Sequence, residues 1–314
     1  MKARATKRSK NKPIGHRRLT TEKSNSASTG LDSKSSLEIA YIINREDAKV
    51  AGAVARSLPE IAQVIDWIAD ALSRGGRLIY VGTGTSGRLA ALDAAECPPT
   101  FNTNRKRVQF IMAGGTKALA EATEASEDSR VLGRREMAKK KPRRNDVVVG
   151  VAASGRTPFT IAALEYARSQ GAKTVAVTCN RNSPLERAAH IAIVAEVGPE
   201  VVAGSTRMKA GTAQKMILNM LTTGAMTRLG YVYGNLMVNL HLKNEKLAER
   251  GTGILEKAAG LNREEAHRLL KAAHQSVPIA LVMAKAAVSR TQAASALTES
   301  RGHVRKAIAI AQSK

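Results

Sequence analysis

The sequence predicts an α/β protein: a doubly wound, mostly parallel five-stranded sheet flanked by helices, followed by a small all-helical region at the carboxyl end. Three observations support this prediction. Short β-branched runs alternate with helical patterns, most of these runs are almost continuously apolar, and the last part of the chain is helical in pattern throughout. Nearly continuous apolar strands are typical of parallel sheets that helices cover on both faces. The five runs are 77–81, 108–112, 146–152, 173–179 and 190–195.

Composition divides the chain into three parts. Residues 1–34 are polar and rich in Lys, Arg, Ser and Thr, so we expect a basic tail, disordered to about Arg18, followed by an extended arm. Residues 35–247 are expected to form the sheet domain, with two helical patterns before the first strand, the second of which opens at Pro59. Residues 248–314 are expected to form a small helical domain.

The composition also limits the classes of partner. Apolar residues make up 43% of the 314 residues but aromatic residues only 3%, so the core must consist mainly of Ala, Val, Leu and Ile. The net charge is +24, but the basic residues cluster in the tail and at Lys139–Arg144, and few aromatic side chains are present to stack on bases. We therefore expect no specific nucleic-acid binding. Two cysteines, Cys97 and Cys179, are too few for a disulfide framework, and no apolar run approaches the roughly 20 residues that span a bilayer. These features predict a cytoplasmic protein that does not enter the membrane.

One turn has the composition of a phosphate cradle. The stretch GTGTSG follows the apolar run 77–81 and precedes an alanine-rich helical pattern. It supplies the hydroxyls of Thr83, Thr85 and Ser86, while Gly84 lets the main chain approach a ligand. The N-terminus of a helix adds unpaired N–H groups and a partial positive charge, which favour an anion. The turn has neither the Lys of a P-loop nor the glycine spacing of a dinucleotide site, and an ordinary, well-capped βα turn is the alternative.

Two further segments repeat this composition. The second turn follows the run 146–152 and consists of Ser154, Gly155, Arg156 and Thr157. Because the carboxyl ends of parallel strands meet at one edge of the sheet, we expect both turns to hold one phosphorylated small molecule between them. A third segment, Gly204–Lys215, adds Ser205 and Lys209 before a long helical pattern. We expect the basic side chains of this segment to bind either a second anionic group of the ligand or merely a neighbouring carboxylate of the protein.

Two glutamates are candidates for acid–base chemistry. Glu96 closes the alanine-rich helical pattern directly before Cys97, and Glu127 lies in an acidic segment after the run 108–112. Two carboxyl groups near a sugar phosphate can act as acid and base if their surroundings separate their pKa values. The alternative for Glu127 is a solvated helix face. The six histidines show no metal-ligand spacing and no nucleophile motif is present, so we expect neither a metal nor a covalent nucleophile.

Five motifs, in order along the chain, carry a family resemblance: GTGTSGRLAALDAAECPPTF, AGGTKALAEATEASEDSR, VVVGVAASGRTPFTIAALEYA, EVVAGSTRMKAGTAQKMILNML and GNLMVNLHLKNEKL. They resemble the N-acetylmuramic acid 6-phosphate etherases of the sugar-isomerase (SIS) superfamily. The resemblance implies a homodimeric lyase, without metal or cofactor, that cleaves the D-lactyl ether of this phosphosugar to N-acetylglucosamine 6-phosphate and D-lactate. It implies that Glu96 protonates the departing lactate oxygen and that Glu127 is its partner acid or base.

The chain departs from the family near these acids, and one distance needs an explanation. Ala95 stands where the family has Ser, and residues 124–128 are EASED where the family has EGAED, but neither change removes a carboxylate. An unbroken helix from Ser86 to Glu96 would extend about 15 Å, which is farther than C3 of a sugar lies from its 6-phosphate. Either this helix is shorter or bent, or Glu96 serves a site shared with a second subunit.

Two other functions fit the same predicted fold. A phosphosugar isomerase would need a base but no room for lactate. A non-catalytic phosphosugar sensor would lack the pair of glutamates or carry a DNA-binding or partner module. Both glutamates are present, and no helix-turn-helix pattern precedes the sheet domain. Because a fold alone does not determine function, the motifs rather than the fold favour the etherase.

Overall fold

The centre of the molecule is a five-stranded parallel sheet with the strand order β2-β1-β3-β4-β5. The computed structural model of the chain describes residues 19–121, 126–240, 242 and 245–313, so the tail that we expect to be disordered lies outside the described residues. The predicted doubly wound sheet is confirmed, and each predicted run matches one strand to within one residue at either end. The strands are β1 (Leu78–Gly82), β2 (Val108–Met112), β3 (Val147–Val151), β4 (Lys173–Thr178) and β5 (Ile191–Val194).

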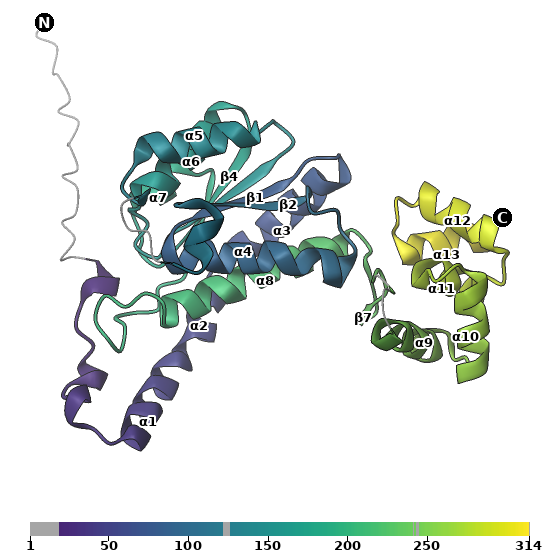
Figure 1. Ribbon diagram of the computed structural model, residues 1–314, viewed down its shortest axis with the longest axis horizontal. Coiled ribbons are helices and arrows are strands. Elements are labelled where there is room, and N and C mark those ends of the chain that lie inside the picture. Colours follow the sequence, from purple (N-terminus) through teal and green to yellow (C-terminus); the bar gives the residue numbers. More distant parts are fainter. Residues whose placement is uncertain (1–18, 122–125, 241, 243–244, 314) are drawn as a thin grey trace, which may run out of the picture.

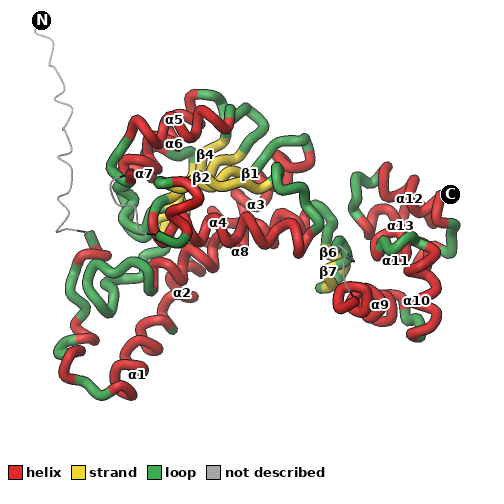
Figure 2. The backbone as a smooth tube through the Cα atoms, viewed as in Figure 1, coloured by secondary structure: helices red, strands yellow, loops and turns green. Residues whose placement is uncertain are grey.

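Helices cover both faces of this sheet (Figures 1 and 2). On one face lie α3 (Leu58–Ser73) and α4 (Gly84–Phe101), with α8 (Lys209–Arg228) packed against both. On the other face lie α5 (Arg130–Lys140), α6 (Pro158–Ser169) and α7 (Pro184–Ala188). Successive side chains of a strand point to opposite faces, so Tyr80 of β1 joins the first core and Ile79 the second. Burial on both faces explains why the strand sequences are apolar throughout.

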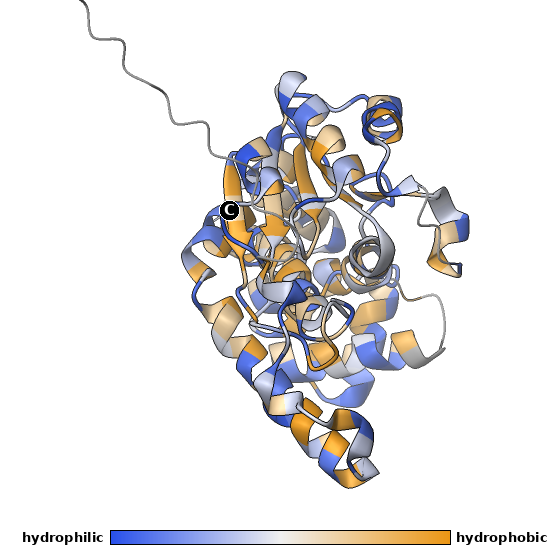
Figure 3. Cartoon of the chain, turned by 90° about the vertical axis from the view of Figure 1, so that its left-hand side faces the viewer, coloured by the Kyte–Doolittle hydropathy of each residue, from blue (hydrophilic) through white to orange (hydrophobic). Residues whose placement is uncertain are grey.

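The amino-terminal part of the described chain projects from the sheet. Instead of the extended arm that we predicted, three short 3-10 turns form, η2 (Thr20–Glu22), η3 (Ser26–Ser28) and η4 (Leu31–Ser33). They lead into α1 (Ser36–Asp47) and α2 (Lys49–Ala55). Ser35 and Glu38 form a capping box that starts α1. Leu37 and Tyr41 of α1 are exposed, and Figure 3 shows apolar stretches on this projecting helix.

The carboxyl-terminal part has its own apolar core. A two-stranded antiparallel hairpin that the sequence analysis missed, β6 (Val232–Tyr233) and β7 (Leu236–Met237), precedes it. The helices that follow are α9 (Glu245–Ala259), α10 (Arg263–Ala272), α11 (Val277–Ala286), α12 (Arg290–Glu299) and α13 (Val304–Gln312). Leu255, Leu270 and Leu281 are buried among these helices, as the predicted helical region requires.

Two further properties of the described chain bear on function. None of its helices is long and apolar enough to cross a membrane. Both cysteines are free and buried, and burial raises the pKa of the Cys97 and Cys179 thiols to about 12.

Candidate active site

The two predicted Gly-Ser-Thr turns start side by side at a switch point of the sheet. From β1 the chain crosses to β2 on one side and returns through β3 on the other, so the turns after β1 and β3 diverge at the carboxyl edge. Gly82, the last residue of β1, pairs with Val151, the last residue of β3. Ligands of open α/β sheets bind in the crevice that such a divergence creates.

The first turn brings Glu127 to the start of α4. Thr83 is the N-cap residue of α4, and Gly84 begins the helix with a φ of +50°. A Cβ atom on Gly84 would lie 3.2 Å from Oε1 of Glu127. Glycine suits this position because it adopts positive φ without strain and leaves room for the carboxylate. One predicted acid therefore lies directly against the predicted cradle.

The start of α8 borders the same turn. The Ser86 hydroxyl donates to Oε1 of the buried Gln214 at 2.9 Å. The Cγ2 atom of Thr85 is 3.5 Å from the position of a Cβ atom on Gly211. Sequence reasoning missed Gln214. It lies in the third segment, Gly204–Lys215, in which hydroxyls and cations, and not an amide, were the expected ligand groups.

The helix that follows the second turn holds the main chain of Glu127. The backbone N–H of Phe159, in the first turn of α6, donates to the carbonyl of Glu127 at 3.0 Å. Gly155 has a φ of +66°, and a Cβ atom there would lie only 2.4 Å from a neighbouring side chain. The Ser154 hydroxyl accepts a hydrogen bond from the Arg156 N–H, which shapes the turn. The half-buried predicted binding residues at this edge are Gly84, Thr85, Ser154, Arg156, Thr157 and Ser205.

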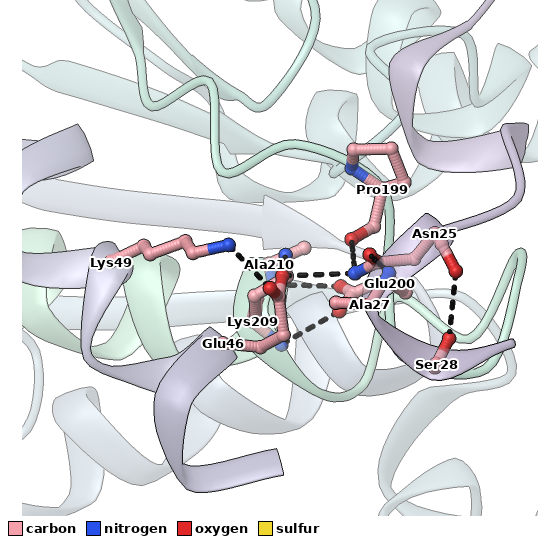
Figure 4. A network of polar contacts seen from close by, with 9 residues as sticks. All are labelled: Asn25, Ala27, Ser28, Glu46, Lys49, Pro199, Glu200, Lys209 and Ala210. Carbon is pink, nitrogen blue, oxygen red and sulfur yellow. Dashed lines mark hydrogen bonds and ion pairs between the residues drawn. The ribbon is translucent and has the colours of Figure 1, made fainter. Parts of the chain in front are cut away.

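Lys209 contacts a neighbouring carboxylate, the second of the two alternatives that the sequence left open. Its Nζ atom pairs with Oε2 of Glu46 at 2.5 Å, and both side chains are buried. Burial would raise the pKa of Glu46, but hydrogen bonds from Lys209, Lys49 and Asn25 outweigh it and lower this pKa to about 2. Figure 4 shows the network, which joins α1 to the start of α8. The ammonium group is therefore enclosed with Glu46, away from any ligand in the crevice.

Glu200 occupies the N-terminus of α8. Its carboxylate accepts the backbone N–H groups of Lys209 at 3.0 Å and Ala210 at 2.9 Å. Burial raises the pKa of Glu200 above its usual value, although these N–H groups act in the opposite direction. This helix end is therefore already capped. In α6, Pro158 has no N–H group and the Phe159 N–H is bound to Glu127, so the N-terminus of α4 is the main candidate among the three to receive a phosphate.

The amino-terminal arm reaches the same edge. The Thr20 N–H donates to Oδ1 of Asn180 at 3.0 Å, and Nδ2 of Asn180 donates to the Ala153 carbonyl, next to the second turn. The N–H of Gly204 donates to the carbonyl of Thr21. The sequence analysis missed Asn180, although its position directly after a predicted strand was a signal for this edge.

Glu96 lies far from this crevice within one chain. Helix α4 is unbroken from Gly84 to Phe101, so the shorter-helix explanation is wrong. Glu96 follows Gly84 by twelve positions, which corresponds to about 18 Å along the helix axis. Glu96 is exposed. The structure therefore does not bring the two predicted acids together in a single chain.

A buried polar cluster fixes α4 one turn before Glu96. Oδ2 of Asp93 accepts from the Tyr80 hydroxyl, and Oδ1 accepts from Asn219 and Thr222. Burial raises the pKa of Asp93, against the effect of these hydrogen bonds. The cluster joins α4 to β1 and α8, so it fixes the direction in which Glu96 projects.

Some predictions about the site remain untested. Among the described residues no group of three or more His, Cys, Asp or Glu side chains could hold a metal ion. The expectation of a reaction without metal or cofactor stays a prediction. Residues 122–125 lie outside the described part of the chain, and they include the first two residues of the EASED segment in which the chain departs from the family.

Comparison with known proteins identifies the family. The profile of the glucokinase regulatory protein N-terminal SIS domain matches residues 60–168, and that of the SIS domain matches residues 134–224. The N-acetylmuramic acid 6-phosphate etherase of Clostridium beijerinckii is 50% identical to this chain over 290 residues, which are 92% of this chain and 95% of the relative. The chain belongs to the N-acetylmuramic acid 6-phosphate etherase family. The family resemblance stated from the motifs is confirmed.

Other members of the etherase family match over the same length. The enzyme of Vibrio vulnificus is 50% identical over 291 residues, 93% of this chain and 97% of its own. Etherase 1 of Enterococcus faecalis is 48% identical over 291 residues with the same coverage. Among solved structures, a phosphoheptose isomerase from Francisella tularensis covers 62% of this chain and 100% of its own, with 18% identity and a TM-score of 0.48.

Proposed function

We propose that this chain cleaves the D-lactyl ether of N-acetylmuramic acid 6-phosphate, giving N-acetylglucosamine 6-phosphate and D-lactate, in the recycling of cell-wall sugars in the cytoplasm. Membership of the etherase family over 92% of the chain supports this activity. The observation in the structure that supports it best is the contact of Glu127 with the start of α4. This contact combines an anion-binding helix end with an acid–base group.

The proposed reaction is an elimination followed by addition of water. In the open-chain aldehyde, a base removes the C2 proton, which the C1 carbonyl acidifies. The C3–O bond then breaks, and an acid protonates the lactate oxygen as it leaves. Water adds at C3 of the unsaturated aldehyde, so that the ether and one water become an alcohol and D-lactate. Glu127 and Glu96 are the proposed acid–base pair, with Glu96 protonating the lactate.

The cradle is proposed to hold the 6-phosphate. Thr83, Gly84, Thr85 and Ser86 surround the N-terminus of α4, and Ser154, Gly155, Arg156 and Thr157 form the adjoining turn, with Ser205 on the third segment. The N–H groups and the partial positive charge at the N-terminus of α4 favour a doubly charged phosphate. Lys209 is left out of this proposed set because its ammonium is paired with Glu46.

We further propose a homodimer in which Glu96 of one copy serves the crevice of the other. Within one chain Glu96 is too far along α4 to meet Glu127, and it lies on an exposed apolar strip of this helix. Leu92, one turn before Glu96, is 53% exposed, and Ala95 and Pro99 are also exposed. A second copy covering this strip would both bury it and remove water from around the acid.

Mixing two inactive variants tests the shared site. In a dimer of one Glu96→Gln and one Glu127→Gln subunit, a shared arrangement leaves one site with both carboxylates. A randomly exchanged equal mixture should therefore regain about a quarter of wild-type activity. If each site used both acids of one chain, the mixture would stay inactive. Sedimentation of each variant alone shows whether it still assembles.

Release of D-lactate from N-acetylmuramic acid 6-phosphate tests the activity itself. Wild type should release lactate, and Glu96→Gln and Glu127→Gln should each lower kcat by about 100-fold or more, the usual size of acid–base contributions. A phosphosugar isomerase or a sensor would release none. Although one matching profile is that of a regulatory protein, relatives that match over nearly the whole chain are etherases, so the sensor is the weaker alternative.

A further inference from the structure

Arg88 joins the first turn of α4 to the segment that leads to Glu127. It lies one helical turn after Gly84 and is half-buried. Its Nε atom donates to the carbonyl of Leu119 at 3.0 Å, and its Nη2 atom donates to the carbonyl of Glu121 at 3.1 Å. Leu119 ends the short 3-10 helix η5 (Gly115–Leu119), and Glu121 is the last described residue before the gap that precedes Glu127.

The described part of the segment between β2 and Glu127 can be held from outside by such contacts. Between residues 113 and 121 it turns through two consecutive residues with positive φ, Gly114 at +80° and Gly115 at +68°, and then forms the five-residue η5. Short 3-10 helices are weakly stabilised by their own hydrogen bonds. A guanidinium group presents its donors in a rigid plane, so two carbonyls bound at once fix both the place and the direction of the segment.

Glu127 is thus held from both sides. After it, the Phe159 N–H binds the Glu127 carbonyl, and Ser129 caps the next helix, α5. Before it, Arg88 binds the two carbonyls of the incoming segment. Arg88 and Gly84 are four residues apart on α4, so they lie on the same side of this helix. The helix that offers its N-terminus to the phosphate therefore also fixes the approach of the acid.

We propose that Arg88 is the positioning residue that places the Glu127 carboxylate against the start of α4 for proton transfer. This proposal rests on the proposed etherase function. Two of the three guanidinium nitrogens of Arg88 bind main-chain carbonyls, so its part is to set the geometry of Glu127. A displacement of an acid–base group by about 1 Å costs up to about 100-fold in rate while leaving substrate binding much less affected. Loss of Arg88 should therefore lower kcat rather than raise KM.

Arg88→Ala and Arg88→Lys test this in the lactate assay. We expect kcat to fall by about 10- to 100-fold in both, because Lys keeps the charge but not the planar pair of donors. KM should change by less than about threefold, since the cradle is intact. Added guanidinium or ethylguanidinium should restore part of kcat to Arg88→Ala and none to Glu127→Gln.

Arg168→Ala is the matched control. Arg168 of α6 also donates to two main-chain carbonyls, those of Ala188 and Ala189, but on a different part of the chain. It should lose stability to a similar extent, keep kcat, and gain nothing from guanidinium. Unchanged kcat in Arg88→Ala, an effect on KM alone, or equal losses of kcat in both arginine variants would overturn the proposal.

Hydrogen exchange separates this proposal from the proposed function. Arg88→Ala should speed backbone exchange in the segment formed by residues 113–121 and 126–130, and Arg168→Ala should not. If wild type releases no lactate but this difference is found, the etherase function fails while the structural role of Arg88 holds. If exchange in the segment is the same in all variants, the role of Arg88 fails whatever the wild-type activity.

Discussion

Oε1 of Glu127 lies 3.2 Å from the place where a Cβ atom of Gly84 would be. This contact joins the proposed acid–base side chain to the helix end that is proposed to bind the phosphate, although 43 positions separate the two residues in the chain. The other candidate acid, Glu96, lies on the helix that Gly84 begins, about 18 Å farther along the helix axis. The N-terminus of α4 is therefore where the proposed phosphate site and one of the two proposed acid–base groups meet.

Gly84→Ala should damage catalysis more than folding. The positive φ of Gly84 strains any other residue by about 1 kcal/mol, and the added Cβ atom would push the Glu127 carboxylate aside. We expect kcat for lactate release to fall by about 10-fold or more. Gly52→Ala is the control: Gly52 lies in α2 with nothing within 4 Å of a Cβ atom. That change should leave kcat unaltered and raise stability by up to about 1 kcal/mol. Full activity in Gly84→Ala would show that the contact with Glu127 is dispensable.

The buried pair of Glu46 and Lys209 should show strong coupling. Removing Glu46 leaves the Lys209 ammonium buried without its counter-charge, and we expect Glu46→Gln to lower the free energy of unfolding by about 3–5 kcal/mol. The double change Glu46→Leu with Lys209→Met should cost less than Glu46→Gln alone. Urea unfolding measures both. Glu196→Gln, which breaks the exposed pair with Arg181, should cost less than about 1 kcal/mol. Additive effects of the Glu46 and Lys209 changes would contradict the coupling.

Stability should depend on pH through Glu46. Its pKa is about 2 in the folded chain, against 4.5 as the usual value. Since folding lowers this pKa, the stabilisation that ionised Glu46 gives the folded chain is complete at pH values above its pKa in the unfolded chain. This stabilisation is lost as the pH falls towards 2. Linkage gives a loss of about 1 kcal/mol by pH 4 and about 2 kcal/mol by pH 3. The measurement is the difference in unfolding free energy between wild type and Glu46→Gln at each pH. Glu200 and Asp93, whose pKa values are raised, contribute equally to the pH dependence of both proteins, so their contributions cancel in this difference. A difference that stays constant from pH 7 to pH 3 would refute the assignment.

The two thiols should be inert in the folded protein. Burial raises the pKa of both Cys97 and Cys179 to about 12, so almost no thiolate exists near pH 8. A colourimetric disulfide reagent should titrate no thiol in the native chain and both in denaturant. Rapid reaction of one thiol without denaturant would show that its surroundings open readily.

The strands of the sheet could be predicted from the sequence, whereas the partners of the charged side chains could not. Each strand is buried on both faces, so its apolar run identifies it without knowledge of its neighbours. Lys209 illustrates the opposite case. The sequence shows a cation before a helix, but the carboxylate that pairs with it, Glu46, lies 163 residues away. Whether a charge binds a ligand or another side chain depends on such distant contacts.

Two local features show where patterns were insufficient. The hairpin of β6 and β7 has only two residues in each strand, too few for alternation to appear, although Gly234 and Asn235 form a recognisable two-residue turn. We predicted that the alanine-rich helix closes at Glu96, yet α4 continues to Phe101 with Pro98 and Pro99 inside it. Proline disfavours the helix interior but does not forbid it when packing holds the helix on both sides.

The two buried cysteines make the chain ready for measurement with site-specific probes. A single new cysteine on the surface would be the reactive thiol, so no native residue of the core has to be removed first. Ala95 and Asp128 are exposed and lie directly beside Glu96 and Glu127. Spin labels at these two positions, on the same subunit or on different ones, would act as a molecular ruler between the acids. The burial of two sulfur atoms thus gives direct access to the distance on which the shared site depends.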